Sequence, residues 1–337
     1  MITSCSNANR SDPILQVSIE NESTQLSQVE FKLPSNPDPK ILSQAYGYLK
    51  GQQFTLDKIK KGYPELELEV TRCELEFNLV FKKASDNINR ELKKLLGNEF
   101  EKYEREMIGD LKSMLSQQII TEDLAINFIE EVKQRSIGKI ESPVLETLLT
   151  YQFIDNPAKE FSSGFINSYS TKGHPKTKDV TINAKLPLSW SQKEGDRPNV
   201  IQKFVSENGK GQEIILFMVT DLGLPNDYKI TKDELNEFFT ESELKQMIPD
   251  GSEFISAKRI TLDNHIGGQL IFMTTQERLD FSLTMQAAHF ITIYEGKMVF
   301  LQCMVSAEVG ENLSDRFNLF LPLFRQVANS LILMDQY

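Results

Sequence analysis

The sequence of 337 residues has few cysteines and no long apolar run. Its three cysteines, Cys5, Cys73 and Cys303, lie far apart, which excludes a disulfide framework and every C-x-x-C metal or redox motif. Cys73 and Cys303 fall in apolar patterns, so we expect both to be buried. No stretch of about 18 apolar residues occurs, and the sequence therefore predicts no membrane-spanning segment.

Basic residues are in the minority, with 37 Lys plus Arg against 48 Asp plus Glu and a net charge of −11. The excess is even, because residues 1–170 hold 20 basic and 26 acidic side chains and residues 171–337 hold 17 and 22. No stripe of Lys and Arg is free of interleaved acids, which disfavours binding to nucleic acid or to an anionic membrane. The acidity indicates a soluble chain, long enough for two domains, and identifies no ligand.

Motifs of catalysis and cofactor binding are also missing. The sequence has no G-x-S-x-G, no Walker loop, no G-x-G-x-x-G after a strand and no H-E-x-x-H. None of the three histidines has a second ligand two to four residues further on, so no metal site is predicted. We therefore expect a protein without a cofactor that is not an enzyme.

Helical periodicity dominates residues 39–155. Apolar residues recur in steps of three and four, most regularly between Leu66 and Leu95, and Gly51 and Gly97 should each end a helix. The pattern predicts a helical hairpin or bundle, with an extended coiled coil as the alternative. The polar residues 1–38 are expected to form a flexible tether, and the Pro- and Gly-punctuated segment 156–178 a linker between two domains.

From residue 179 onwards the apolar period changes to two. Alternation from Val180 leads to the only tryptophan, Trp190, and predicts a half-buried strand. Two threonine capping boxes predict one broken helix or two short ones over 232–247. Strands are expected at 200–206, 214–219, 254–262, 269–275, 280–294 and 298–305, and a last amphipathic helix over 317–331. Short turns between consecutive strands predict an antiparallel sheet, and hence an α+β fold.

The order of these elements resembles that of the PsbP-like family, which includes the extrinsic photosystem subunit and a Ran-binding import factor. The resemblance lies in the opening strand that ends at Leu186-Pro187-Leu188-Ser189-Trp190, in a hairpin through Asn208–Gly211, in the helix at 232–247 and in the meander at 254–305. It implies an α-β-α sandwich over 179–337 and a binding role as an adaptor, assembly factor or chaperone-like protein. It carries no catalytic residue.

One loop stands out as a candidate binding surface. Glu194-Gly195-Asp196-Arg197-Pro198-Asn199 combines opposite charges with glycine and proline, close to Trp190. Such a loop can orient a partner protein or simply close a turn. We select Trp190, Glu194, Asp196, Arg197 and Asn199 as partner-binding candidates.

Cys5 belongs to a second motif. Ile2-Thr3-Ser4-Cys5 is similar to the lipobox of bacterial lipoproteins, in which the cysteine is acylated. A lipid on Cys5 would anchor the protein in the cell envelope, and this would be its one contact with a membrane. The alternative is an ordinary terminus with a chance cysteine.

The sequence leaves three functional hypotheses. The first is a non-enzymatic envelope protein that binds a partner protein of unknown identity. The second is a cytoplasmic adaptor or chaperone-like protein without a lipid. The third is an enzyme with its site between the domains, which a deep pocket gathering His174, Asp196, Arg197 or His265 would favour.

Overall fold

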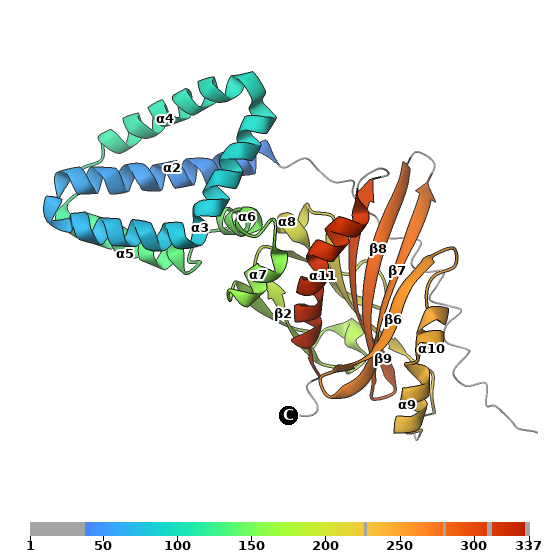
Figure 1. Ribbon diagram of the computed structural model, residues 1–337. Coiled ribbons are helices and arrows are strands. Elements are labelled where there is room, and N and C mark those ends of the chain that lie inside the picture. The colour runs from blue at the N-terminus through green and yellow to red at the C-terminus, as the bar shows by residue number, and fades with distance from the viewer. Residues whose placement is uncertain (1–37, 226–227, 279–280, 309–311, 334–337) are drawn as a thin grey trace, which may run out of the picture.

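The computed structural model of the chain describes residues 38–225, 228–278, 281–308 and 312–333. Helices occupy the first part of this chain and two antiparallel sheets the second, so the protein has the α+β fold that the sequence predicts (Figure 1). No described helix is both long enough and apolar enough to cross a membrane.

The helical part consists of α2 (Pro39–Gly62), α3 (Glu67–Leu96), α4 (Phe100–Ser116), α5 (Glu122–Ser136) and α6 (Val144–Gln152). Helix α2 begins where the Asp38 side chain accepts a hydrogen bond of 2.9 Å from the Lys40 amide, and α3 ends at Gly97, whose φ is +52°. The predicted break at Gly51 is wrong. Glycine costs only about 1 kcal/mol in a helix, and apolar residues on both sides, such as Leu42 and Leu56, are buried.

These helices share one core rather than forming an extended coiled coil. Helix α3 packs against α2, α5 and α6, and the strongest apolar stripe of the sequence faces inward. Its most buried members are Cys73, Phe81, Ala84, Ile88 and Leu92. We call the whole cluster of buried apolar side chains to which they belong, from Leu42 to Phe153, the helical core.

The segment 156–178 is not the irregular linker that the sequence predicts. It contains helix α7 (Pro157–Ser162) and strand β1 (Ile166–Ser170), which pairs with β2 (Ile182–Pro187) beside the short β10 (Ile332–Leu333). Ala158 lies in the core of the sheet region, and Phe165 packs against the helical core. The prolines and glycines of this segment bound short elements, and short elements with such boundaries have the composition of a linker.

The main sheet has seven strands in the order β3-β4-β5-β9-β8-β7-β6, all paired antiparallel. The two strands of the first hairpin are short, and those of the later meander are long. The strands are β3 (Ser191–Glu194), β4 (Val200–Val205), β5 (Glu213–Asp221), β6 (Glu253–Leu262), β7 (His265–Arg278), β8 (Phe281–Tyr294) and β9 (Lys297–Glu308).

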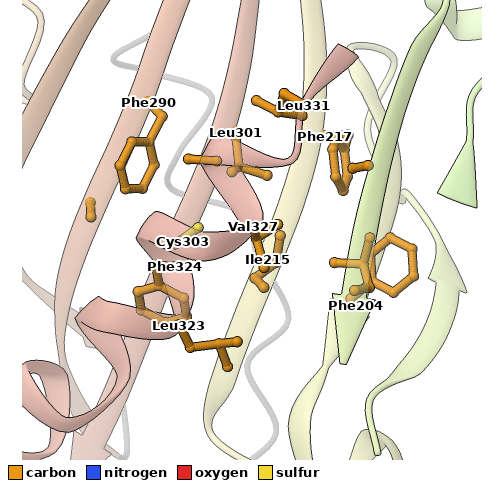
Figure 2. Close-up of a cluster of buried hydrophobic side chains, with 14 of the residues drawn as sticks. Phe204, Ile215, Phe217, Phe290, Leu301, Cys303, Leu323, Phe324, Val327 and Leu331 are labelled. Carbon is orange, nitrogen blue, oxygen red and sulfur yellow. The ribbon is translucent and has the colours of Figure 1, made fainter. Parts of the chain in front are cut away.

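Helices cover the main sheet on both faces, which gives the α-β-α sandwich. Helix α11 (Leu313–Asn329) lies on one face, where its Leu323, Phe324 and Val327 meet Ile215 and Cys303 of the strands (Figure 2). We call the whole cluster of buried apolar side chains to which they belong, from Ala158 to Leu333, the sheet core. The short helices α9 (Lys232–Phe238) and α10 (Glu241–Gln246) pack against the opposite face near β6 and β7 (Figure 1).

Candidate binding pocket between the helices and the sheet

A pocket of about 140 Å³ lies where the helical part meets the sheet part. In Figure 1 this is the region of α6, α7 and the one-turn segment α8 (Ser206–Gly209), beside α11. Both parts contribute to its lining: Thr150, Phe153, Ile154, Pro157, Glu160, Ser189, Trp190, Ser206, Glu207, Arg316, Leu319 and Phe320.

An aromatic wall forms one side of this interface pocket. Trp190 and Phe320 meet edge to face, with ring centroids 6.4 Å apart, and Phe153 comes from the helical part. Trp190 is placed by a tight turn after β2, in which its amide bonds the Pro187 carbonyl at 3.3 Å. The pocket therefore offers aromatic and apolar surface to a ligand.

Glu160 of α7 supplies the first polar group. Its two carboxyl oxygens accept hydrogen bonds from the Ser189 amide at 2.8 Å and from the Ser189 hydroxyl at 2.7 Å. Burial raises the pKa of Glu160 to about 7, although the Ser189 donors oppose the shift. Glu160 thus changes its charge close to neutral pH.

An ion pair between Glu213 and Arg316 supplies the second polar group. Glu213 at the start of β5 is fully buried, and its carboxylate accepts hydrogen bonds from the Arg316 Nε of α11 and from the Ser206 hydroxyl. Both oxygens of Glu213 are therefore engaged. Because the carboxylate and guanidinium neutralise each other, Arg316 adds little net positive charge to the pocket.

Glu207 carries the third carboxylate, and the backbone holds it in an unusual conformation. Glu207 and Asn208 both have positive φ, +50° and +52°, in the left-handed region that non-glycine residues rarely adopt. A hydrogen bond of 2.9 Å from the Asn208 amide to the Ser189 carbonyl ties this turn to the pocket. The Glu207 carboxylate lies 3.7 Å from Arg316 Nη2, and its pKa is raised, first by burial and then by Glu213.

The candidate residues from the sequence do not converge on one site. Trp190 lines the interface pocket, but Glu194 lies at the far end of the four-residue strand β3, about 13 Å away at the usual rise of a strand. Glu194 pairs with His174 at 3.1 Å and with Lys176 at 3.2 Å. Glu194 thus bonds to side chains of the segment 174–176, which is outside the lining of the interface pocket.

The rest of the loop also makes local contacts. Asp196 pairs with Lys203 at 3.0 Å, and the Asn199 carbonyl accepts a hydrogen bond of 3.3 Å from the Val219 amide. Arg197 is half-buried, which lowers its pKa, and within the described ranges its Nη2 atom has no hydrogen-bond partner. His265, in turn, packs edge to face on Tyr294 in the main sheet. His174, Asp196, Arg197 and His265 line none of four pockets formed by the described residues, the interface pocket included.

Sequence reasoning missed most of the polar residues of the interface pocket. Glu160 falls in the predicted linker, and Ser206 and Glu207 fall in a predicted strand end and hairpin. Glu213 directly precedes the apolar run Ile214–Val219, and Arg316 directly precedes the apolar stripe of the last helix. A charged residue at the start of a buried strand, such as Glu213, is the one signal that could have indicated a buried ion pair.

A wider groove of about 950 Å³ runs along α2, α5 and α6. Its central side chain, Arg135, hydrogen-bonds Gln52 and Glu131 and stacks on the rings of Tyr48 and Phe128. Because Arg135 already has hydrogen-bond and ring partners within the groove, we place the candidate site in the interface pocket.

Over the described residues, no group of three His, Cys, Asp or Glu side chains could hold a metal ion. Cys5 lies outside the described residues.

No family model and no curated protein matches this sequence. Among solved structures, the solution structure of cyanobacterial PsbP from Synechocystis sp. PCC 6803 is similar, with 17% identity, a TM-score of 0.31, and coverage of 50% of this chain and 92% of that chain. LpqN of Mycobacterium tuberculosis, described as involved in cell envelope biogenesis, has 14% identity, a TM-score of 0.30, and coverage of 52% and 95%. A PsbP is thus among the similar structures, as the sequence resemblance predicts, but similarity at this level says nothing about what this chain does.

Proposed function

We propose that this protein is a non-enzymatic binding protein that captures a partner protein in the interface pocket. The observation that carries the proposal is the aromatic pair of Trp190 and Phe320 beside the carboxyl groups of Glu160 and Glu207, at the junction of the two parts of the chain. Clefts between structural units with an apolar lining and a few convergent polar groups are typical ligand sites. A partner side chain inserted there would contact both parts at once.

A second candidate is an enzyme that uses the same pocket. The pKa of Glu160, raised to about 7, is in the range that suits a general acid or base. We rank this candidate second because both Glu160 oxygens accept hydrogen bonds from Ser189, which holds the carboxyl group in place. Mass spectrometry of recovered ligands separates the two candidates, since an enzyme would return them chemically changed.

A selection from random peptides tests the binding function without assuming a ligand class. Peptides enriched on the full chain should bind the wild type and fail on Leu319→Trp, which fills the rim of the pocket. Leu79→Trp is the matched control, because Leu79 is likewise an exposed leucine, on α3 and outside the pocket lining. Enriched peptides that bind Leu319→Trp as well as the wild type, or no enrichment at all, would contradict the proposal.

The loop of Asp196 and Arg197 provides the competing binding surface. The double variant Asp196→Ala with Arg197→Ala should leave binding of the enriched peptides unchanged, because these residues lie outside the pocket lining. Loss of binding in this double variant, with retention in Leu319→Trp, would instead assign partner capture to the loop.

We further propose that the protein works in the cell envelope, held by a lipid on Cys5. The support is the sequence Ile2-Thr3-Ser4-Cys5. Expression of the gene with its own upstream sequence, in the presence of an alkyne analogue of palmitate, should label the wild type and not Cys5→Ser. A wild type without label would favour the cytoplasmic adaptor or chaperone-like protein.

A further inference from the structure

We propose that the interface pocket binds the alkylammonium group of a lysine side chain of the partner, with Glu207 as the charge partner of that group. This inference rests on the proposed function, since it names the chemistry that the pocket would recognise. It follows from the charge balance, the ring faces, the volume and the backbone conformation of the pocket.

The charge balance favours a cation. Glu160 and Glu207 bring two carboxyl groups to the pocket lining, whereas Arg316 brings one guanidinium group. Arg316 is bonded to the fully buried Glu213, so the carboxyl groups of Glu160 and Glu207 have no full counter-charge. A bound ammonium group would supply it.

The aromatic wall favours the same ligand. Trp190 and Phe320 present ring surface to the pocket, and a cation above a ring face is attracted by the negative charge density of that face. The four methylene groups of lysine would pack against Ile154 and Leu319 at the rim, which are 39% and 36% exposed. One lysine side chain thus satisfies both the apolar and the acidic lining.

The volume limits the ligand to a single side chain. A cavity of about 140 Å³ has room for more than one water molecule, yet it is smaller than the roughly 300–1,000 Å³ of a drug-sized site. A lysine side chain suits such a cavity because its charge is carried by one compact ammonium group at the end of a flexible apolar stem.

The backbone positions Glu207 for this role. Glu207 and Asn208, both with positive φ, form the turn between β4 and β5, and this turn holds Glu207 in the pocket lining. Among the described residues, Arg316 is the one cation that pairs with the Glu207 carboxylate within 4.0 Å. The distance of 3.7 Å between Arg316 Nη2 and the carboxylate exceeds that of a hydrogen bond. Glu207 therefore has acceptor capacity left for an incoming ammonium group.

The lone tryptophan makes the inference directly testable. Three capped tripeptides, Ac-Gly-Lys-Gly-NH₂, Ac-Gly-Nle-Gly-NH₂ and Ac-Gly-Glu-Gly-NH₂, are titrated against the full chain while the emission of Trp190 is recorded. The lysine peptide should change the emission saturably. The norleucine peptide, which has the same apolar chain without the charge, should bind at least about tenfold more weakly, and the glutamate peptide should not bind.

Variants at two glutamates assign the effect to Glu207. Glu207→Gln should weaken the lysine peptide about tenfold and leave the norleucine peptide unchanged. Glu194→Gln is the matched control, because Glu194 is a carboxylate at the far end of β3. Circular dichroism shows whether Glu207→Gln folds.

A pH series tests the same point on the unmodified chain. The titratable and charged groups of the pocket lining are Glu160 of α7, Glu207 of α8 and Arg316 of α11, and Glu213 of β5 bonds Arg316. Asp38, Tyr151 and Lys210 line a second pocket together with Glu207. Since burial raises the pKa of both Glu160 and Glu207, the lysine peptide should bind more tightly at pH 8 than at pH 6, whereas binding of the norleucine peptide should not change.

The outcomes separate this inference from the proposed function. Three results would overturn the inference of a cationic ligand and still leave the pocket as a binding site. They are preferential binding of the glutamate peptide, equal affinities for the lysine and norleucine peptides, and an unchanged affinity of Glu207→Gln for the lysine peptide. If no tripeptide binds but selected peptides depend on the open rim at Leu319, the lysine inference again fails alone. Failure of the selected peptides contradicts the proposed function itself.

Discussion

Glu160 is a carboxyl group whose burial links folding to pH. Its pKa is raised from 4.5 to about 7, so the folded chain binds the proton more tightly than the unfolded chain does. The stabilisation from this proton is fully present below pH 4.5 and is lost as the pH rises through 7. Integrated over that window, the loss is about 3 kcal/mol as an upper limit.

We expect Glu160→Gln to remove this dependence, because the amide side chain does not titrate and can still accept a hydrogen bond from the Ser189 amide. We measure the free energy of unfolding of both proteins in urea at pH 5 and at pH 8. The stability of the variant relative to the wild type should be higher at pH 8 than at pH 5. Glu194→Gln serves as the exposed control. Parallel pH curves for Glu160→Gln and the wild type would contradict the raised pKa.

The two described cysteines are predicted to be inert thiols in the folded protein. Cys73 and Cys303 are both fully buried, and burial raises the pKa of Cys73 to about 11 and that of Cys303 well above its usual value. Since the thiolate is the reactive form, Cys5→Ser should show no rapid reaction with a disulfide reagent at pH 8 and should react at two thiols in urea. One fast thiol in the folded variant would show that a core opens readily.

Single residues were predictable from the sequence where their environment is local. Cys73 and Cys303 are buried, as their apolar neighbours indicate. Trp190, a partner-binding candidate because the loop 194–199 lies close to it in the sequence, lines the interface pocket, and its role in binding stays a prediction. The partners of the ion pair in the pocket floor, Glu213 and Arg316, are 103 positions apart, and no periodicity or spacing connects residues that only tertiary packing brings together.

At the scale of elements, Gly267 permits the close approach of β7 to the backbone of β8. A Cβ atom at Gly267 would lie 2.4 Å from the Ile291 carbonyl oxygen, which belongs to the backbone and cannot move aside. We expect Gly267→Ala to lower the free energy of unfolding by about 1–3 kcal/mol, the usual cost of overpacking. Denaturation in urea gives this value.

Gly109 in α4 is the matched control for this prediction. A Cβ atom at Gly109 would meet nothing within 4 Å, and the residue lies in a helix at an exposed position. Gly109→Ala should therefore stabilise the chain by about 0.5–1 kcal/mol, the difference in helix propensity. Equal effects of the two substitutions would show that strand spacing at β7 and β8 is not the cause.

Elements with explicit end signals were predictable, and those shaped by neighbours were not. The capping boxes near Thr231 and Thr240 correctly predict α9 and α10, with both threonines accepting from backbone amides. The turn predicted over 263–268 shrinks to Asp263 and Asn264, because β7 already begins at His265, which pairs with Leu262 at the end of β6. Strand pairing, rather than local composition, sets where β7 starts.

At the scale of the molecule, the change from the helical core to the sheet core takes place within a few residues. Phe153 at the end of α6 belongs to the helical core and Ala158 in α7 to the sheet core. The sequence predicts the change of period only from residue 179, after a linker over 156–178, since α7 and β1 are too short to show a period of their own. Leu188 and Phe165 pack back onto the helical core, and Lys210 pairs with Asp38 at 2.7 Å, so side chains as well as the chain itself connect the two parts.

Two separate cores predict two unfolding transitions. Ile88 in the helical core and Leu323 in the sheet core are both fully buried, and truncation of either to alanine should cost about 2–5 kcal/mol. In scanning calorimetry of the full chain, we expect Ile88→Ala to lower the temperature of one transition by several degrees and Leu323→Ala to lower that of the other. A single transition that both variants shift equally would mean that the interface couples the cores into one cooperative unit. A peptide bound in the interface pocket contacts both parts of the chain, so at saturation it should raise both transition temperatures in the wild type and neither in Leu319→Trp.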